Sequence, residues 1–473
     1  MNKTYDVVVL GGGMGGYIAA IRASQLGKSV ALVERDKLGG TCLHRGCIPS
    51  KALLRSAELF AQMKASEQYG IAATGVSLQF DRVQQRKTGI VDKLHKGVQY
   101  LMKKHRIEVI SGNGRIIAPS IFAPRSGSVA VELADGESET LVPEQLIIAT
   151  GSRPRQLQGI PFEDERIMTS DEALAMEQLP ESILIIGGGV IGVEWASMLG
   201  DFGVKVTVAE YADRLVPTED EDVSKELEKV LVKRGIRVLT GVKVLPETAA
   251  ADGAGITLQA ERRGETIALQ AERVLVSIGR AANVEGIGLE NTDVVVENGA
   301  IKVNGYMQTA EAHIYAVGDV IGGLQLAHVA GHEGIVAAEH IAGQKPQAAA
   351  AHRIPRCIYT RPEIASVGWT ERQAKERGME VAVGRFPFSA LGKAQVYGEA
   401  AGFVKVVADR ITNDIVGVHM IGPHATDLIS EAALAQLLNA TPWEAGQVIR
   451  PHPSLSEAFG DALLAIDGHS VNL

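Results

Sequence analysis

The stretch that decides the fold runs from Tyr5 to Asp36 and reads YDVVVLGGGMGGYIAAIRASQLGKSVALVERD. It begins with a short β-branched run, passes through a glycine-rich turn into a helix-forming segment, and ends in a second apolar run. A buried parallel strand, a glycine turn and a helix in this order are typical of a β-α-β unit. The stretch therefore predicts an α/β fold with a doubly wound, largely parallel sheet.

The same pattern recurs at Ser182–Asp213, SILIIGGGVIGVEWASMLGDFGVKVTVAEYAD. The first glycine of such a unit allows the turn, the second lets backbone approach a pyrophosphate, the third packs helix on strand, and the closing acid binds a ribose. These positions are Gly11, Gly13, Gly16 and Glu34 in the first copy, and Gly187, Gly189, Gly192 and Glu210 in the second. A single glycine motif is weak evidence, but two complete copies at one constant offset predict two dinucleotide sites, one for a flavin and one for a nicotinamide.

Glu210 also indicates which nicotinamide cofactor the second copy takes. A carboxylate at this position repels a 2′-phosphate, whereas it can accept hydrogen bonds from a ribose 2′-OH. No arginine follows it until Arg214. The sequence therefore favours NAD over NADP.

Composition sets broader limits. The 473 residues predict about three domains. The net charge of -9 argues against nucleic acid as a partner. The N-terminus has no signal-peptide pattern, and the apolar run around Glu194 is too interrupted to span a bilayer. We expect a cytoplasmic protein without a membrane segment, in which three cysteines form no disulfide framework.

Several segments between and after the repeats predict further elements. Two strand endings, QLIIATGSRP with Thr150 and Gly151 and RVLVSIGRAAN with Gly279, close nucleotide-binding units, and residues 215–275 predict further strands. TAEAHIYAVGDVIGG predicts a buried strand that ends at Asp319, before a helix over residues 326–342. Residues 346–473 predict a separate α+β domain, with a hairpin around residues 412–414.

The segment GGTCLHRGCIPSK places Cys42 and Cys47 close together. A metal site would need more ligands than His44 supplies, and a structural disulfide over so short a loop would add little stability. The third interpretation, a redox pair at the start of a helix, is favoured. Residues five apart in a regular helix have Cα atoms about 8.6 Å apart, more than the roughly 7 Å a disulfide allows. The turn must then be distorted, which Gly46 permits.

GGTCLHRGCIPSK, the doubled glycine motif, IYAVGD and HPSLSE together resemble the flavin-dependent disulfide reductases, and within them the branch that oxidises dihydrolipoyl groups with NAD. The resemblance covers essentially the whole chain. It implies an FAD domain in residues 1–150, an NAD domain in 151–275, a central segment in 276–345 that completes the FAD domain, and an interface domain in 346–473. It also implies a homodimer in which both subunits contribute to each active site.

The resemblance assigns roles to residues of the two dinucleotide units. Cys42 would exchange with the lipoyl sulfurs, and Cys47 would contact the flavin. Lys51 would lie near the flavin and pair with Glu194, for which the alternative is a solvated glutamate on a helix face. Further cofactor contacts are implied for Glu34 at the FAD ribose, for Asp319 at the ribityl chain, and for Ala327 and His328 near the flavin ring.

His452 and Glu457 would be the catalytic base and the carboxylate that orients it. SLSE at Ser454–Glu457 also fits a helix capping box, in which Glu457 would bond the Ser454 N–H. Both interpretations remain open on the residues alone. The segment departs from the family's usual pattern at Ser454, and CLHRGC departs from it at His44 and Arg45.

The resemblance implies that the partners are the lipoyl domain and the subunit-binding domain of a 2-oxo acid dehydrogenase acyltransferase. The residues of the CLHRGC and GVEWASM segments favour a branched-chain 2-oxo acid dehydrogenase complex. The alternatives are a glutathione-type reductase, which Glu210 opposes, a mercuric reductase, which would end in a cysteine pair, and a flavin transhydrogenase, which would lack the disulfide. A redox-sensing flavoprotein without turnover would need none of the catalytic residues.

Overall fold

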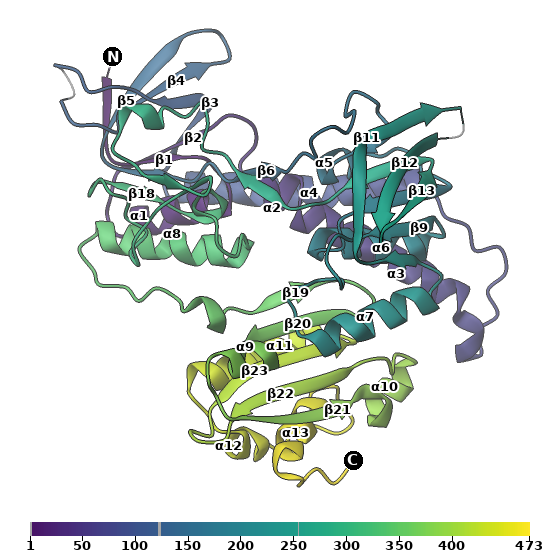
Figure 1. Ribbon diagram of the computed structural model, residues 1–473. Helices are drawn as coiled ribbons and strands as arrows, with labels where there is room; N and C mark the ends of the chain where they lie inside the picture. Colours follow the sequence, from purple (N-terminus) through teal and green to yellow (C-terminus); the bar gives the residue numbers. More distant parts are fainter. Residues whose placement is uncertain (1, 122–123, 254) are drawn as a thin grey trace. The chain divides into compact units, whose positions relative to one another are not determined.

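The computed structural model describes residues 2–121, 124–253 and 255–473, which fall into two compact units (Figure 1). The first unit consists of Met1–Ala52, Arg82–Arg155 and Arg280–Ala349. The second unit consists of Leu53–Asp81, Gln156–Gly279 and Ala350–Leu473. Each unit contains one of the two glycine motifs.

The first unit is built on a six-stranded sheet of order β1-β2-β3-β4-β5-β18, in which β1 also pairs with β5. β1 is parallel to β2 and β5, and β18 is parallel to β5, whereas β4 is antiparallel to both of its neighbours. The strands are β1 Asn2–Leu10, β2 Val30–Glu34, β3 Glu108–Ile116, β4 Val129–Leu133, β5 Ser138–Ile148 and β18 Ile314–Ala316. The sheet thus joins strands from both ends of the unit's sequence.

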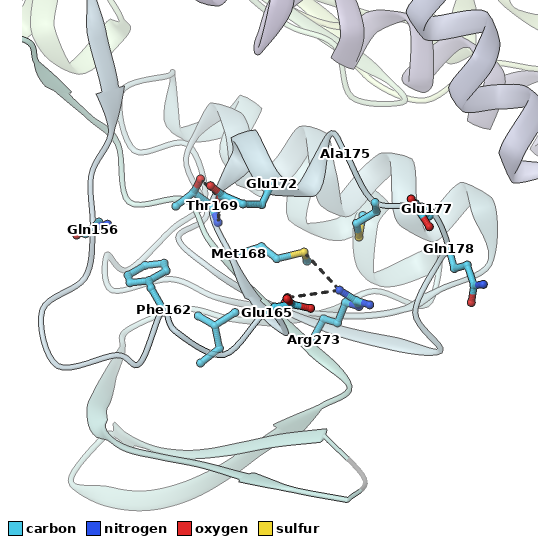
Figure 2. A pocket seen from close by; sticks show the side chains of 12 residues that line it. Gln156, Phe162, Glu165, Met168, Thr169, Glu172, Ala175, Glu177, Gln178 and Arg273 are labelled. Carbon is cyan, nitrogen blue, oxygen red and sulfur yellow. Dashed lines mark hydrogen bonds between the residues drawn. The ribbon is translucent and has the colours of Figure 1, made fainter.

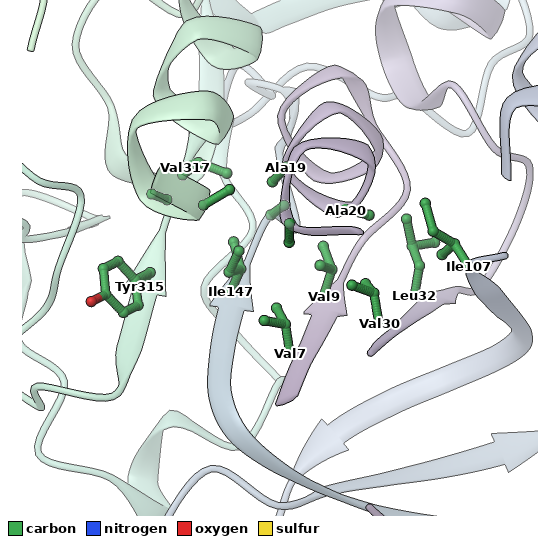
Figure 3. Packing of buried hydrophobic residues seen from close by; sticks show 14 of the residues in the cluster. Val7, Val9, Ala19, Ala20, Val30, Leu32, Ile107, Ile147, Tyr315 and Val317 are labelled. Atoms are coloured by element: carbon green, nitrogen blue, oxygen red, sulfur yellow. The ribbon is translucent and has the colours of Figure 1, made fainter. Parts of the chain in front are cut away.

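Two helices, α1 (Met14–Gln25) and α8 (Ala327–Ile341), pack against each other in this unit. A Cβ atom on Gly334 would lie 2.5 Å from the carbonyl oxygen of Gly15, so the two backbones approach closely. Figure 3 shows Ala19 and Ala20 of α1 beside side chains of the sheet strands. These residues belong to one buried apolar cluster, which covers one face of the sheet.

Three further helices follow the first β-α-β unit. They are α2 Gly40–His44, α3 Cys47–Lys64 and α4 Phe80–Lys104, with the 3-10 turn η1 Ser66–Tyr69 between the last two. Helix α3 confirms the helix predicted to start at the cysteine pair, and Cys42 lies before it in the separate short helix α2. Helix α4 was not predicted from the sequence, although Val91, Val98 and Met102 face the core at helical spacing.

The second unit contains a five-stranded parallel sheet of order β10-β9-β8-β14-β7. Its strands are β7 Ile167–Met168, β8 Ser182–Ile186, β9 Lys205–Ala209, β10 Arg237–Leu239 and β14 Arg273–Val276. An antiparallel sheet of β11 Val242–Asp252, β12 Gly255–Arg262 and β13 Glu265–Ala271 lies between β10 and β14 in the sequence.

The helices around these strands are α5 Ser170–Ala173, α6 Val190–Phe202 and α7 Glu221–Lys233. Strands β10 to β14 confirm the further strands predicted within residues 215–275, whereas α7 in the same range was not predicted. The Asp220 carboxylate accepts the N–H of Asp222 and caps this helix. Val223, Leu227 and Leu231 are buried at the spacing of one helix face, which stabilises a helix here instead of a strand.

The C-terminal part of the second unit is an antiparallel sheet of order β19-β20-β23-β22-β21, covered by helices. Its strands are β19 Arg356–Ile358, β20 Glu363–Gly368, β21 Val381–Pro387, β22 Phe403–Asp409 and β23 Ile415–Gly422. Its helices are α9 Glu371–Glu376, α10 Gly392–Tyr397, α11 Ala425–Leu437, α12 Pro442–Gly446 and α13 Glu457–Leu464. The β22–β23 hairpin confirms the turn predicted around residues 412–414.

Short elements complete the fold. The first unit contains the antiparallel pair β6 Ser152–Pro154 with β15 Arg280–Ala282, the pair β16 Val296–Glu297 with β17 Ala300–Ile301, and the 3-10 turn η3 Gly318–Ile321. No helix in the described part of the chain is long and apolar enough to cross a membrane. The predicted domain boundaries stay a prediction.

Candidate functional site

The first glycine turn leaves the backbone N–H groups at the start of α1 uncovered by side chains. A Cβ atom on Gly11 would lie 2.3 Å from the carbonyl oxygen of Ala149, and one on Gly16 would lie 1.9 Å from the Gly11 oxygen. Gly13 is the N-cap of α1 and provides no side-chain cap, and the nearest atom to its Cβ position is the Gly40 Cα at 3.9 Å. The helix N-terminus therefore offers backbone N–H groups and space that suit a pyrophosphate.

Glu34 closes this unit at the end of β2. Its two carboxylate oxygens accept the backbone N–H groups of Gly12 at 2.7 Å and Asp36 at 2.8 Å. Those bonds hold the carboxylate beside the glycine turn, and an ionised carboxylate has lone pairs left for further donors. The residues present thus fit a dinucleotide such as FAD, whose adenosine ribose would donate to Glu34.

The cysteine segment starts directly on this turn. The Gly39 N–H donates to the Gly12 carbonyl at 2.8 Å, and a Cβ on Gly40 would lie 2.7 Å from the Gly13 Cα. A residue with a side chain at Gly40 would collide with the turn. The backbone contact therefore places α2, which carries Cys42, against the N-terminus of α1.

Cys42 and Cys47 lie on opposite sides of the break between α2 and α3. Arg45 follows α2 as its C-cap with φ -135°, and Cys47 is the first residue of α3. A Cβ on Gly46 would lie 3.1 Å from the Thr41 carbonyl oxygen, so glycine lets the chain turn back closely here. The break is the distortion that the cysteine spacing requires.

The two cysteines are hydrogen-bonded thiols in the structure. The pKa of Cys42 is raised, first by its hydrogen bond to Cys47 and then by burial, while the charge of Lys51 acts in the opposite direction. The raised pKa favours the protonated thiol of Cys42 in the reduced pair.

Asp319, in η3, belongs to a polar cluster with Ser152 and Arg280, which were not predicted as site residues. The Ser152 hydroxyl donates to Asp319 Oδ2 at 2.5 Å, and Arg280 Nε donates to the same hydroxyl at 2.7 Å. The Arg280 guanidinium lies 3.8 Å from Asp319. Ser152 and Arg280 directly follow Gly151 and Gly279 in the sequence, so the predicted strand endings contained the signal.

The remaining predicted FAD residues also lie in the first unit. The Thr150 hydroxyl donates to the Asn283 carbonyl at 2.8 Å, and Asn283 Nδ2 donates back to the Thr150 carbonyl at 2.9 Å. These bonds fix the turn at Gly151, where φ is +69°. Ala327 is the first residue of α8, whose N-cap provides no side-chain bond.

The second glycine turn repeats the geometry of the first. A Cβ on Gly187 would lie 2.5 Å from the Ser277 carbonyl oxygen, and one on Gly192 would lie 1.9 Å from the Gly187 oxygen. Gly189 is the N-cap of α6 without a side-chain cap, and no atom lies within 4 Å of its Cβ position. Gly279, with φ +109°, follows β14. This turn also leaves room for a pyrophosphate.

Glu210 occupies the position that Glu34 has in the first copy. It accepts the backbone N–H groups of Gly188 and Ala212. Arg214, the nearest arginine after it, instead donates to the Pro217 carbonyl at 2.6 Å. These residues therefore fit NAD, because the carboxylate faces the turn and Arg214 is engaged elsewhere.

Glu194 is buried in α6, with 7% of its surface exposed, and accepts the Tyr359 N–H at 2.9 Å. This burial rules out the alternative of a solvated glutamate. Lys51 belongs to the first unit and Glu194 to the second. The predicted pairing of the two residues stays a prediction.

His452 and Glu457 are brought together at the start of α13. His452 Nδ1 lies 2.8 Å from one Glu457 oxygen, and the other oxygen accepts the Ser454 N–H at 2.8 Å. Burial would raise the pKa of Glu457, but the bonds from Ser454 and His452 outweigh it and lower that pKa. The imidazole is 79% exposed, so its remaining nitrogen can reach a substrate.

Comparison with known proteins identifies the family. The family described as pyridine nucleotide-disulphide oxidoreductase matches residues 5–334, and its dimerisation domain matches residues 354–463. The chain belongs to this family. Its FAD and NAD domains and its C-terminal dimerisation domain confirm the predicted fold class.

Known proteins match this chain along its whole length. The chain is 62% identical to a dihydrolipoyl dehydrogenase of Bacillus subtilis over 473 residues, which covers 100% of both chains. It is 41% identical to a dihydrolipoyl dehydrogenase of Zymomonas mobilis, again over 100% of both. Among solved structures it resembles LpdA from Mycobacterium tuberculosis, with a TM-score of 0.89, 27% identity and coverage of 98% and 99% of the two chains.

Membership in the family makes the chain an oxidoreductase enzyme with FAD and NAD as its cofactors, as the sequence predicted. No group of three or more histidine, cysteine or acidic side chains within the described ranges could hold a metal ion.

The second unit also contains a cavity of about 600 Å³ (Figure 2). Figure 2 shows Arg273 and Met168 beside it, and Arg273 Nη1 lies 3.5 Å from the Glu165 carbonyl oxygen. The cavity is also lined by Phe162 and Glu172. None of the predicted catalytic or cofactor-binding residues lines it.

Proposed function

We propose that this protein is a dihydrolipoyl dehydrogenase, which converts a protein-bound dihydrolipoyl group and NAD⁺ into the lipoyl disulfide, NADH and a proton. The observation that carries the proposal is the Cys42–Cys47 pair, two hydrogen-bonded thiols at a helix break beside a dinucleotide turn. The 62% identity to a dihydrolipoyl dehydrogenase over the full chain supports the choice of substrate.

In the first half of the reaction the enzyme begins as the Cys42–Cys47 disulfide. One substrate thiolate attacks Cys42, and Cys47 leaves as a thiolate. The second substrate thiolate then attacks the sulfur bound to Cys42, which completes the lipoyl disulfide and leaves both cysteines reduced. His452 takes a proton from the substrate dithiol, because Glu457 holds Nδ1–H and leaves Nε2 as the acceptor.

In the second half the reduced pair returns to the disulfide. The proton on Cys42 must leave before a bond to Cys47 can form, and the positive charge of Lys51 favours that loss. Bound FAD would supply the two-electron chemistry that links oxidation of the cysteine pair to reduction of NAD⁺. Glu34 and Glu210 would orient the two cofactors through their riboses, and Asp319 would bind the ribityl chain of FAD.

A homodimer belongs to this proposal. The C-terminal part carries exposed apolar side chains at the end of α11 and in the segments after it. Large exposed apolar patches of this kind mark interaction surfaces. Leu437 is 66% exposed, Trp443 is 63% exposed and Ile449 is 96% exposed. We infer that a second copy covers this surface and that His452 serves the cysteine pair of the partner subunit.

The proposed function also implies partner proteins, a cellular compartment and a role for each domain. The partners would be the lipoyl domain and the subunit-binding domain of a 2-oxo acid dehydrogenase acyltransferase, of the branched-chain type that the sequence favours, in the cytoplasm. Residues 1–150 and 276–345 would bind FAD, residues 151–275 would bind NAD, and residues 346–473 would form the dimer interface.

One comparison of activities tests the substrate and the direction. Anaerobic reduction of NAD⁺ by dihydrolipoamide should be fast, and oxidation of NADPH by glutathione disulfide should be negligible. The reverse result would make the protein a glutathione-type reductase. Cys47→Ser should remove the long-wavelength absorbance of the reduced holoenzyme, whereas Cys42→Ser should keep it. If Cys47→Ser keeps that absorbance, the roles of the two cysteines are exchanged.

A further inference from the structure

Two histidines meet at one backbone oxygen beside the cysteine segment. His44 Nε2 and His95 Nδ1 each lie 2.9 Å from the Leu38 carbonyl oxygen. Their rings are 5.1 Å apart in an edge-to-face arrangement. A carbonyl oxygen only accepts hydrogen bonds, so both ring nitrogens must carry a hydrogen and donate it.

Three segments meet at the Leu38 carbonyl oxygen: the backbone before α2, the end of α2, and α4. Leu38 immediately precedes the Gly39–Gly40 backbone that contacts the first glycine turn. His44 is the last residue of α2, and His95 projects from α4. The two bonds therefore tie both ends of the helix that carries Cys42 to each other and to α4.

The chemistry of the His44–His95 pair favours a structural role, in which the rings hold the backbone in place, over proton transfer. Burial lowers the pKa of His44, and the neighbouring His95 and Lys37 lower it further, while the bond to Leu38 and the charge of Asp36 act in the opposite direction. A neutral imidazole has one N–H, and His44 uses it on Leu38. Arg45, the next residue, forms an ion pair with Asp36 in which both side chains are about half exposed. Such a pair adds little stability, so the histidine pair carries most of the constraint.

We propose that His44 and His95 are positioning residues, which hold Cys42 against the glycine turn through the Leu38 oxygen. The proposal rests on the proposed function, in which Cys42 is the sulfur that meets the substrate. It gives a role to His44, one of the two positions at which CLHRGC departs from the family's usual pattern.

Matched variants separate positioning from acid–base chemistry. His44→Gln and His95→Asn keep an N–H donor near Nε2 and Nδ1 respectively, but cannot act as bases near neutral pH. His44→Phe and His95→Phe keep a ring and lose the donor. Lys96→Gln, at an exposed neighbouring position of α4, is the control for a substitution on that helix.

Two readouts on the dimeric holoenzyme test the proposal. The first is the rate at which iodoacetamide alkylates Cys42 in the reduced enzyme, followed by mass spectrometry of the peptide. The second is kcat and KM for dihydrolipoamide between pH 6 and 9. Losing one hydrogen bond should raise the alkylation rate and lower kcat about fivefold in the two phenylalanine variants. Thermal unfolding and retained flavin absorbance check that each variant is folded.

The Gln and Asn variants should match wild type in alkylation, kcat and pH profile. The double phenylalanine variant loses both bonds to Leu38 and should be more impaired than either single variant. Loss of a limb of the pH profile in His44→Gln or His95→Asn would overturn the proposal in favour of proton transfer. Phenylalanine variants that match wild type, alongside an active wild-type enzyme, would also overturn it. An inactive wild-type enzyme would instead contradict the proposed function.

Discussion

His452 Nδ1 lies 2.8 Å from Glu457 Oε1, and Glu457 Oε2 accepts the Ser454 N–H at the same distance. One carboxylate therefore makes both predicted contacts, although the predicted capping box is incomplete, because the N-cap of α13 is Ser456 and provides no side-chain bond. The Ser454 bond fixes the carboxylate at the start of α13, and the fixed carboxylate orients the imidazole. A helix-terminus bond thus serves as the support of a candidate catalytic base.

This relationship predicts a graded loss of activity. His452→Gln should lower kcat for dihydrolipoamide oxidation by about 10²- to 10⁴-fold, the usual contribution of a general base. Glu457→Gln should lower it less, because an amide oxygen can still accept Nδ1–H while it stabilises the imidazolium less. Steady-state kinetics measures both. Equal losses in the two variants would mean that Glu457 does more than orient the ring.

Gly46 should be needed for the break between α2 and α3. In Gly46→Ala the new Cβ would lie 3.1 Å from the Thr41 oxygen, so the backbone must shift, at a cost of about 1–3 kcal/mol in unfolding free energy. Disulfide formation on mild oxidation should slow as well. Gly89→Ala in α4 is the control, since nothing lies within 4 Å of that position and alanine should stabilise the helix by about 0.5–1 kcal/mol. If both variants unfold alike, the contact at Thr41 does not matter.

Glu210 should determine the choice of nicotinamide cofactor. Glu210→Ala should lower kcat/KM for NAD about 10- to 100-fold, because charged hydrogen bonds to the ribose are lost, and should raise kcat/KM for NADP. Reduction of the enzyme by dihydrolipoamide should stay unchanged in a stopped-flow experiment. An unchanged ratio of NAD to NADP activity would show that Glu210 does not meet the ribose.

Glu333 should make the stability of the first unit depend on pH. Burial raises its pKa to about 7, with a further contribution from Asp319, against the Gly318 N–H that donates to it at 2.8 Å. The folded state then holds a proton that the unfolded state releases near pH 4.5, so this contribution is full below that pH and is lost as the pH rises through about 7.

Urea unfolding of the apoprotein between pH 4.5 and 8 measures this effect. Glu333→Gln should flatten the pH dependence of the unfolding free energy over that range. The control is Glu339→Gln in the same helix, whose carboxylate pairs with Arg22 in a partly exposed ion pair. An unaltered slope in Glu333→Gln would assign the dependence to other groups.

Lys405 should be essential to the stability of the second unit. Only 3% of its side chain is exposed, and Nζ lies 3.0 Å from Asp220, 2.8 Å from Asp222 and 2.8 Å from Glu371. Lys405→Ala would leave these carboxylates together without their cation, at a cost of about 3–5 kcal/mol. Lys375→Ala, which removes an exposed partner of Glu371, should cost about 0.5 kcal/mol or less by the same denaturant titration. Similar losses of unfolding free energy in Lys405→Ala and Lys375→Ala would mean that water reaches Lys405.

The sequence determined the features that depend on neighbours along the chain. The two β-α-β units, their glycines and their closing acids could be predicted because each follows from local spacing and from the conformational freedom of glycine. The break near Gly46 was also predictable, because helix geometry does not allow residues five apart to form a disulfide. Helices α4 and α7 were missed although their apolar spacing was present.

Only the tertiary structure decided which distant residues share an atom. Ser152 and Arg280 meet at Asp319 from separate segments, and His44 and His95 meet at the Leu38 oxygen from two helices. No periodicity encodes such contacts, because they depend on how the packed core aligns elements that are far apart in the sequence. The sequence thus supplied the chemistry of the cysteine pair, and packing against the glycine turn and α4 set the position from which that chemistry can act.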